Sequence, residues 1–160
     1  MSSIQIRVDG DTEKLLEKLK KIENIDKQGV NNALAEILRT STLDRFESTT
    51  APDGSGWKQS IRAAEGGKTL TKTARLKNSI QATANDIGFA VGTNTIYAAT
   101  HQFGDSRTIR AKNGKYLKFQ VGGVWRQAKE VTIHIPARPF LGVSQEDEQE
   151  IKATLEDALR

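Results

Sequence analysis

The spacing of apolar residues changes twice along this chain of 160 residues, and this change limits its fold more than any other feature. From about residue 11 to residue 46 apolar residues recur every three or four positions, as in amphipathic helices. From about residue 79 to residue 135 they alternate with polar residues, as in half-buried strands, and after Ser144 the helical spacing returns. The pattern predicts an α+β fold in one domain, residues 1–160. N-terminal helices pack on a small, mostly antiparallel sheet with a β-hairpin extension and a C-terminal helix.

Capping residues locate the helices. Asp11 is the expected N-cap of a helix over residues 11–23, and a longer helix is expected to begin near Asp26. Ser144 is the expected N-cap of the last helix, with Asp147 at its third position as in a capping box. Shorter helices are predicted over residues 68–80 and just before Gly104, a residue suited to ending one. The inward-facing residues predicted for the two longest helices are Val30, Ala33, Leu34, Ile37, Leu38 and Phe46, then Ile151, Leu155, Ala158 and Leu159.

Turn residues separate the expected strands. A first strand is predicted over residues 3–8, and residues 79–84 and 88–92 are predicted to form a hairpin. Asn113-Gly114 is the strongest hairpin signal because this dipeptide favours a type I′ turn, and it predicts that residues 108–110 pair with residues 116–119. Gly122-Gly123 offers a second turn. Residues 131, 133 and 135 alternate as one buried face, so His134 is expected to point the other way.

Composition excludes several classes of protein. With 36% hydrophobic and 28% charged residues, the chain has the balance of a globular domain. It contains neither a run of about 18 apolar residues nor a basic segment followed by an apolar one at its start, so no membrane span and no secretory signal are expected. The absence of cysteine excludes disulfides, thiolate zinc sites and cysteine nucleophiles, and it suits a reducing cytoplasm.

His101 and Asp105 are the first residues to test for catalysis or metal binding. Because Gly104 is expected to end a helix between them, we do not expect the two side chains to share a face. Zinc needs at least a third ligand, and His134 is the one other imidazole. No G-x-S-x-G nucleophile motif is present, and Gly54-Ser-Gly56 lacks the residues that complete a phosphate loop. The sequence therefore predicts no enzymatic activity, no metal and no cofactor.

Charge is distributed unevenly along the chain. Residues 105–138 carry eight basic residues against two acidic ones, whereas residues 144–160 carry six acidic residues against two basic ones. This asymmetry suits either nucleic-acid binding or head-to-tail contact between copies of the protein. The basic extension, at about residues 105–131, also contains three aromatic residues, although a charged outer face that keeps an edge strand soluble is the simpler interpretation. The candidate contacts with DNA or a partner are Arg110, Lys112, Lys115, Lys118 and Arg126.

Two further segments have alternative interpretations. Trp57 follows a Pro-Asp-Gly turn in a polar stretch, where it serves either as a local plug over the edge of the domain or as an interface anchor. The segment Pro136-Ala-Arg-Pro-Phe-Leu-Gly142 is stiffened by its prolines. It forms either an internal corner before the last helix or a subunit contact. Arg138 is a candidate to bind a carboxylate, inside the domain or across a subunit boundary.

Four motifs now stand in a fixed order: PDG-x-x-W at residues 52–57, L-x-x-S-I at 76–80, Y-A-x-x-H-Q-F-G at 97–104 and P-A-R-P-F-L-G at 136–142. In this order, over about residues 40–155, the chain resembles the phage virion morphogenesis family, also called the tail completion family, of Mu-like and other tailed phages and prophages. The resemblance implies a non-enzymatic protein that completes the tail or joins it to the head. It would lie at the neck or tail end of the virion after assembly in the host cytoplasm.

The resemblance also implies partners. Related tail-end proteins form rings, often hexameric, so a homo-oligomeric ring that binds other neck and tail proteins is expected, with no membrane. Contact with packaged DNA is a further candidate role, which rests on the basic extension and not on the resemblance. No catalytic role is implied for the matching residues. The residues expected at a subunit or partner interface are Trp57, Tyr97, His101, Gln102, Phe103, Arg138 and Phe140.

Overall fold

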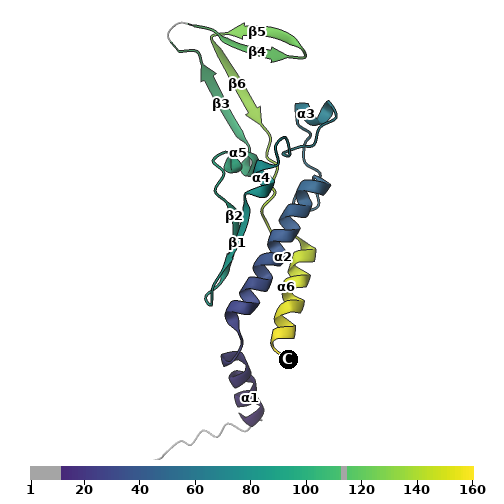
Figure 1. The fold of residues 1–160 in the computed structure, drawn as a ribbon, viewed down its shortest axis with the longest axis vertical. Coiled ribbons are helices and arrows are strands. Elements are labelled where there is room, and N and C mark those ends of the chain that lie inside the picture. The colour runs from purple at the N-terminus through teal and green to yellow at the C-terminus, as the bar shows by residue number, and fades with distance from the viewer. Residues whose placement is uncertain (1–11, 113–114) are drawn as a thin grey trace, which may run out of the picture.

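The computed structural model describes residues 12–112 and 115–160, and in this part of the chain the molecule is elongated (Figure 1). Helix α1 (Thr12–Glu23) lies at one end, followed by the long helix α2 (Lys27–Ser48). The last helix, α6 (Gln145–Ala158), lies beside α2. The strand predicted over residues 3–8 lies outside the described residues. None of the described helices has the length and apolar character that a membrane crossing requires.

The predicted caps are confirmed at both long helices. The Asp26 carboxylate accepts a hydrogen bond from the backbone nitrogen of Gly29 (2.9 Å), which satisfies one free donor at the start of α2. At α6 the Ser144 hydroxyl accepts from the backbone nitrogen of Asp147, and the Asp147 carboxylate accepts from that of Ser144. This reciprocal pair is a complete capping box. Local sequence therefore sets where both helices begin.

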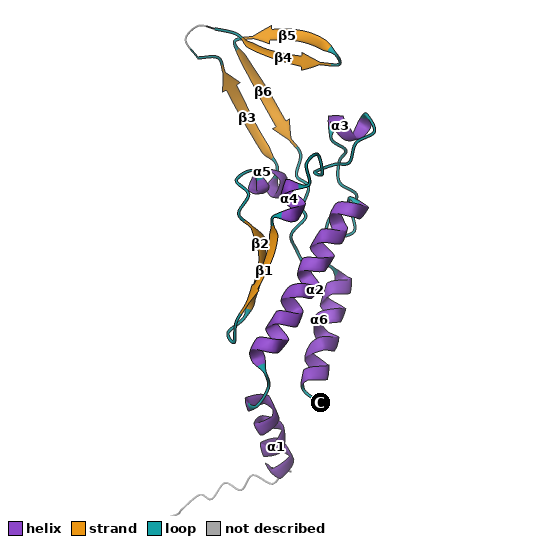
Figure 2. Cartoon of the chain, viewed as in Figure 1, coloured by secondary structure: helices purple, strands orange, loops and turns teal. Residues whose placement is uncertain are grey.

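Among the described residues the strands form three separate antiparallel pairs, as Figure 2 shows. Strands β1 (Ile80–Ala84) and β2 (Phe89–Thr93) form the predicted hairpin beside α2. Strand β3 (Asp105–Arg110) pairs with β6 (Glu130–Ile135), and β4 (Leu117–Val121) pairs with β5 (Val124–Ala128). Two short helices, α3 (Ile61–Ala64) and α4 (Arg75–Asn78), lie between α2 and β1, and a third, α5 (Ala98–Phe103), lies between β2 and β3 and is ended by Gly104 as predicted. The α+β class is thereby confirmed.

The pairing predicted from Asn113-Gly114 is wrong. The strands on either side of this dipeptide do not pair with each other: β3 pairs with β6, twenty or more residues away in sequence, and β4 turns back on β5 through Gly122-Gly123. Strand β6 is the better partner because it matches β3 over six residues. It also adds the hydroxyl pair Thr108–Thr132 (2.9 Å) and an ion pair between Arg110 and Glu130 (3.0 Å).

Two helix predictions also need correction. The helix expected over residues 68–80 is limited to α4, because Leu70 and Ala74 adopt positive φ angles of 59° and 53°, which a helix excludes. In α6, Leu155 and Leu159 are 42% and 46% exposed, so they do not face inward as predicted. The end of α6 therefore leaves part of its apolar side uncovered.

The main hydrophobic core lies where the end of α2 meets the loops. Its centre is Phe46, whose ring packs edge-on against Trp57 (centroids 5.5 Å apart) and at an angle against Phe140 (5.4 Å). Leu76 and Ile80 complete this cluster from α4 and the start of β1. Ala98, at the start of α5, belongs to the cluster as well, so all four sequence motifs contribute a buried apolar side chain to one core.

Candidate functional site

The two strands β3 and β6, with the β4–β5 hairpin at their outer end, form a projection that we call the arm: residues 105–112 and 115–135 (Figure 1). Both ends of the arm meet the body at one place, which we call the arm root and define as residues 97–104 and 136–142. Strand β3 begins directly after Gly104, and β6 ends directly before Pro136. The direction of the arm therefore depends on how the root is held.

Gln102 holds the two halves of the root together. Its side-chain oxygen accepts hydrogen bonds from the backbone nitrogens of Phe140 and Leu141 (3.0 Å each). Its side-chain nitrogen donates to the carbonyl oxygen of Leu141 (2.8 Å). One amide side chain thus satisfies three backbone groups of an extended segment that belongs to no sheet.

Arg138 and Trp57 bind the root to the loop after α2. The Arg138 guanidinium donates to the carbonyl oxygens of Lys58 (2.6 Å) and Gln59 (3.4 Å), and the Arg138 backbone nitrogen donates to the carbonyl oxygen of His101 (2.7 Å). The Trp57 indole nitrogen donates to the carbonyl oxygen of Pro139 (2.7 Å). Both side chains are almost fully buried, so these bonds act inside the subunit.

Arg45 of α2 forms a second, fully buried connection. Its guanidinium donates to the carbonyl oxygens of Phe140 (3.1 Å) and Gly142 (2.9 Å) and to the carboxylate of Asp147 (2.5 Å). Burial alone raises the pKa of Asp147. Hydrogen bonds with Ser41 and Ser144 and the charge of Arg45 outweigh it, so the pKa lies below its ordinary value. The sequence analysis did not predict this pair. The one signal in the sequence was Arg45 itself, a charged residue next to Phe46 on the apolar side of α2.

Gly104 is required by the geometry of the root. Its φ of 77° and ψ of 172° fall in a region that is essentially restricted to glycine. A Cβ atom at this position would lie 2.9 Å from the backbone nitrogen of Ala137 and 3.0 Å from the carbonyl oxygen of Ile135. The glycine therefore allows the first strand of the arm to leave the body in close contact with the last one.

His101 belongs to the root, where its ring packs edge-on against Tyr97 (5.8 Å). Its Nδ1 atom is buried and finds no hydrogen-bond partner within the described residues. Burial of the ring, together with the positive charge of Arg138, lowers the pKa of His101. Asp105 instead forms an ion pair with Arg107 (3.4 Å). Among the described residues no cluster of three or more histidine and acidic side chains has the arrangement of a metal site.

Replacing Gln102 by alanine is expected to destabilise the root. The change leaves two backbone nitrogens and one carbonyl oxygen without their partner, and each unsatisfied buried group costs about 1–3 kcal/mol when water does not reach it. Because the site is half-buried, we expect a loss of about 2 kcal/mol in the free energy of unfolding, measured by urea denaturation. The exposed Gln120→Ala serves as the control. Equal stability of Gln102→Ala and the parent protein would contradict the assigned role.

His101 is expected to make the folded state sensitive to mild acid. Because its folded pKa lies below the ordinary value of 6.5, the unfolded chain binds the proton more readily, and stability falls as the pH drops below about 6.5. The variant His101→Leu is expected to lose less stability than the parent between pH 7 and pH 5. Thermal unfolding at closely spaced pH values measures this difference. If the stability of the two proteins fell by the same amount over this pH range, the prediction would be disproved.

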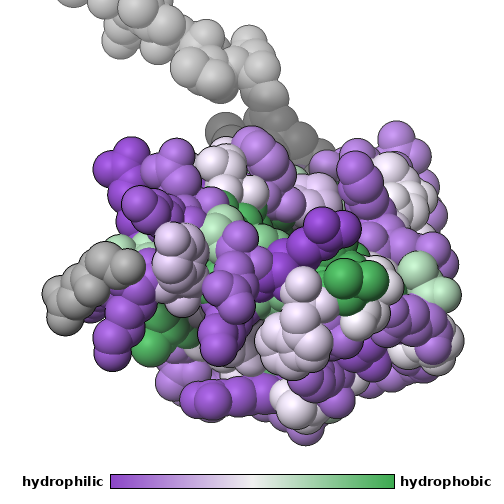
Figure 3. Space-filling model, turned by 90° about the horizontal axis from the view of Figure 1, so that it is seen from above, coloured by the Kyte–Doolittle hydropathy of each residue, from purple (hydrophilic) through white to green (hydrophobic). Residues whose placement is uncertain are grey.

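The arm surface is basic and exposed. The predicted contact residues Arg110, Lys112, Lys115, Lys118 and Arg126 all lie on it with exposed side chains, as do Tyr116 (56% exposed) and Trp125 (71%). Arg107 and Arg110 have acidic partners, whereas Lys115, Lys118 and Arg126 form no ion pair within the described residues. Seen from the arm end, the molecule is mostly hydrophilic, with hydrophobic residues in separate patches (Figure 3).

The residues predicted for an interface divide into two groups. Trp57, Arg138 and Phe140 are buried and contact their own chain, in accord with the plug and corner interpretations, and Gln102 and His101 are half-buried in the same root. Tyr97 (40% exposed) and Phe103 (79%) present their rings to the surface. The interface hypothesis is therefore best kept for these two aromatic residues.

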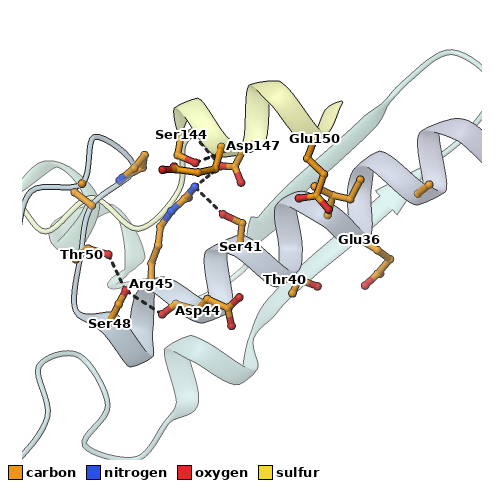
Figure 4. Close-up of a pocket in the computed structure, with 16 residues that line it drawn as sticks. Glu36, Thr40, Ser41, Asp44, Arg45, Ser48, Thr50, Ser144, Asp147 and Glu150 are labelled. Atoms are coloured by element: carbon orange, nitrogen blue, oxygen red, sulfur yellow. Dashed lines mark hydrogen bonds and ion pairs between the residues drawn. The ribbon is translucent and has the colours of Figure 1, made fainter. Parts of the chain in front are cut away.

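A groove runs between α2 and α6 on the body, with a volume of about 640 Å³ (Figure 4). Glu36 and Asp44 line it from α2, and Glu146 and Glu150 from α6. The apolar residues Ala33 and Ile37 also line it. The buried Arg45–Asp147 pair also lines the groove, whose exposed charged side chains are the four carboxylates.

Comparison with known proteins gives two matches. The model of the phage virion morphogenesis family matches residues 8–160. A Haemophilus influenzae protein described as "Mu-like prophage FluMu G protein 2" is 32% identical over 126 residues, which cover 78% of this chain and 72% of that protein. No solved structure shows a significant match.

Proposed function

Because the chain belongs to the phage virion morphogenesis family, we propose that it is a non-enzymatic structural protein that completes the tail or joins it to the head. It works as an oligomeric ring, expected to be hexameric, at the neck or tail end of the virion, where it binds other neck and tail proteins. The family match over nearly the whole chain is the observation that carries this proposal.

The shape of the subunit supports an assembly role. A closed ring needs two different surfaces on each copy, because each subunit contacts the next one head to tail. The arm and the α2–α6 groove are two such surfaces, and they carry opposite charges. The root fixes the arm through buried hydrogen bonds, which suits a contact that must recur with the same geometry in every copy.

The ring is tested with purified protein. Light scattering over a range of concentrations and negative-stain images are expected to show closed rings, alone or after addition of the tail proteins encoded by the same phage. A strict monomer under all of these conditions would overturn the ring. Deletion of the gene from an inducible prophage is expected to yield separate heads and tails, and normal virions would contradict the role in assembly.

A second candidate function is nucleic-acid binding by the arm, supported by one specific observation. Lys118 and Trp125 lie on the same face of the β4–β5 hairpin, because Trp125 pairs with Gln120, two residues after Lys118. An exposed ring beside an unpaired cation suits base stacking and phosphate contact. Fluorescence anisotropy with DNA at about 50 and 200 mM salt tests this function, since phosphate contacts give a steep salt dependence. Binding that is unchanged by salt and by Lys112→Glu, Lys115→Glu and Lys118→Glu together would exclude it.

A further inference from the structure

The outer end of the arm has the features of a surface that another molecule covers. We call the β4–β5 hairpin, residues 117–128, the arm tip. It is a two-stranded sheet, and such a hairpin is marginally stable in water on its own. Next to its Gly122-Gly123 turn the side chains of Val121, Val124 and Trp125 are 59%, 54% and 71% exposed. Large apolar side chains that gather at a projecting turn indicate a contact site.

The arm tip carries a cation on each of its two faces. In the hairpin register Lys118 lies opposite Gln127, and Arg126 lies opposite Phe119. Neighbouring pairs in a ladder point to opposite faces, so Lys118 and Arg126 project on opposite sides of the hairpin. Within the described residues neither has an acidic partner, since both carboxylates of the arm pair with Arg107 and Arg110 nearer the body.

The α2–α6 groove has the complementary arrangement. Its two helical walls each carry two carboxylates, Glu36 and Asp44 on α2 and Glu146 and Glu150 on α6 (Figure 4). Of these, Glu36 pairs with Arg39, whereas the other three form no ion pair within the part of the chain that the structure describes. Apolar side chains, including Ile37, line the groove as well. Acidic walls with apolar lining match a narrow hairpin that has apolar residues at its turn and a cation on each face.

We propose that the arm tip of one copy inserts into the α2–α6 groove of a second copy. Val121 and Val124 lie against the apolar lining, while Lys118 and Arg126 face the carboxylates of opposite walls. This inference rests on the ring proposed above and specifies its subunit contact. The tip lies at the outer end of the arm, away from the groove of its own chain (Figure 1), so the occupant comes from a neighbour. The contact joins two different surfaces, so its repetition generates a ring when the rotation from one copy to the next closes.

Charge reversal tests the contact. The tip variant Lys118→Glu/Arg126→Glu and the groove variant Asp44→Lys/Glu150→Lys change only exposed residues, and circular dichroism checks their folding. Each variant alone is expected to raise the concentration needed for assembly at least about tenfold, because like charges then face each other. Both changes in one chain restore opposite charges at every contact, so assembly returns. The proposal would be overturned if the tip variant assembled as readily as the unmodified protein. It would also be overturned if the combined variant assembled no more readily than the tip variant or the groove variant alone.

Cysteine cross-linking tests the same contact by position. Because the chain has no cysteine, Val121→Cys at the tip and Thr40→Cys in the groove provide the two thiols. A short bismaleimide is expected to give a ladder of covalent oligomers. The matched control pairs Val121→Cys with Ile87→Cys, which is 90% exposed at the β1–β2 turn, and is expected to give none. Rings without the tip–groove ladder would overturn the docking but leave the ring standing. A monomer in every condition would overturn both.

Discussion

Replacing Arg45 by alanine is expected to lower the free energy of unfolding by about 3–5 kcal/mol, a large part of the roughly 5–15 kcal/mol that stabilises an ordinary domain. Among the described residues the guanidinium is the one charged partner of the buried Asp147, and it also binds the carbonyl oxygens of Phe140 and Gly142. Its removal leaves a negative charge and two carbonyl oxygens without the partner that binds them in the parent protein. Urea denaturation followed by the fluorescence of the buried Trp57 measures the loss.

The matched control is Arg39→Ala on the same helix. Arg39 forms an exposed ion pair with Glu36 (3.2 Å), and pairs of this kind contribute about 0–1 kcal/mol. Arg39 also donates to the carbonyl oxygen of Ile80 (3.3 Å), so Arg39→Ala is expected to cost about 1–2 kcal/mol in total, less than Arg45→Ala. A second variant, Arg45→Ala/Asp147→Ala, removes both charges and is expected to recover part of the lost stability, because the uncompensated carboxylate is the largest cost. If Arg45→Ala were no more damaging than Arg39→Ala, the connection between α2, the root and α6 would not depend on this residue.

Features set by neighbouring residues were predictable from the sequence. The Asp26 cap, the Ser144–Asp147 capping box and the end of α5 at Gly104 each involve residues within four positions of one another. The pairing of β3 with β6 was not predictable in this way. The Asn-Gly signal is local, whereas twenty or more residues separate the two strands and their pairing depends on cross-strand contacts. Local turn preference was outweighed by tertiary structure.

The motif residues were identified correctly as a related set, but sequence could not show what relates them. Gln102 and Phe140 are almost forty residues apart, and the hydrogen bond between them joins two segments that lie outside any sheet. An aromatic or arginine residue in a loop looks the same in sequence whether it serves a subunit interface or an internal corner. Burial of Trp57 and Arg138 favours the corner, whereas exposure of Phe103 leaves that ring free for a partner.

Replacing Gly104 by alanine is expected to cost about 2–4 kcal/mol and to loosen the arm at its root. Part of this cost is strain, because alanine rarely adopts a φ of 77° with an extended ψ. The rest is the clash of its Cβ with the backbone at Ala137 and Ile135, which cannot move aside as a flexible side chain would. Hydrogen exchange is expected to quicken in β3 and β6, and urea denaturation measures the stability.

The control is Gly88→Ala at the β1–β2 turn, where an added Cβ meets no atom within 4 Å and φ is not in the left-handed range. It is expected to change stability by less than about 1 kcal/mol. Because the arm is proposed to reach a neighbouring subunit, Gly104→Ala is also expected to impair assembly under conditions where the monomer is still folded. A variant with normal stability and normal exchange in β3 would show that the root does not fix the arm through this close backbone contact.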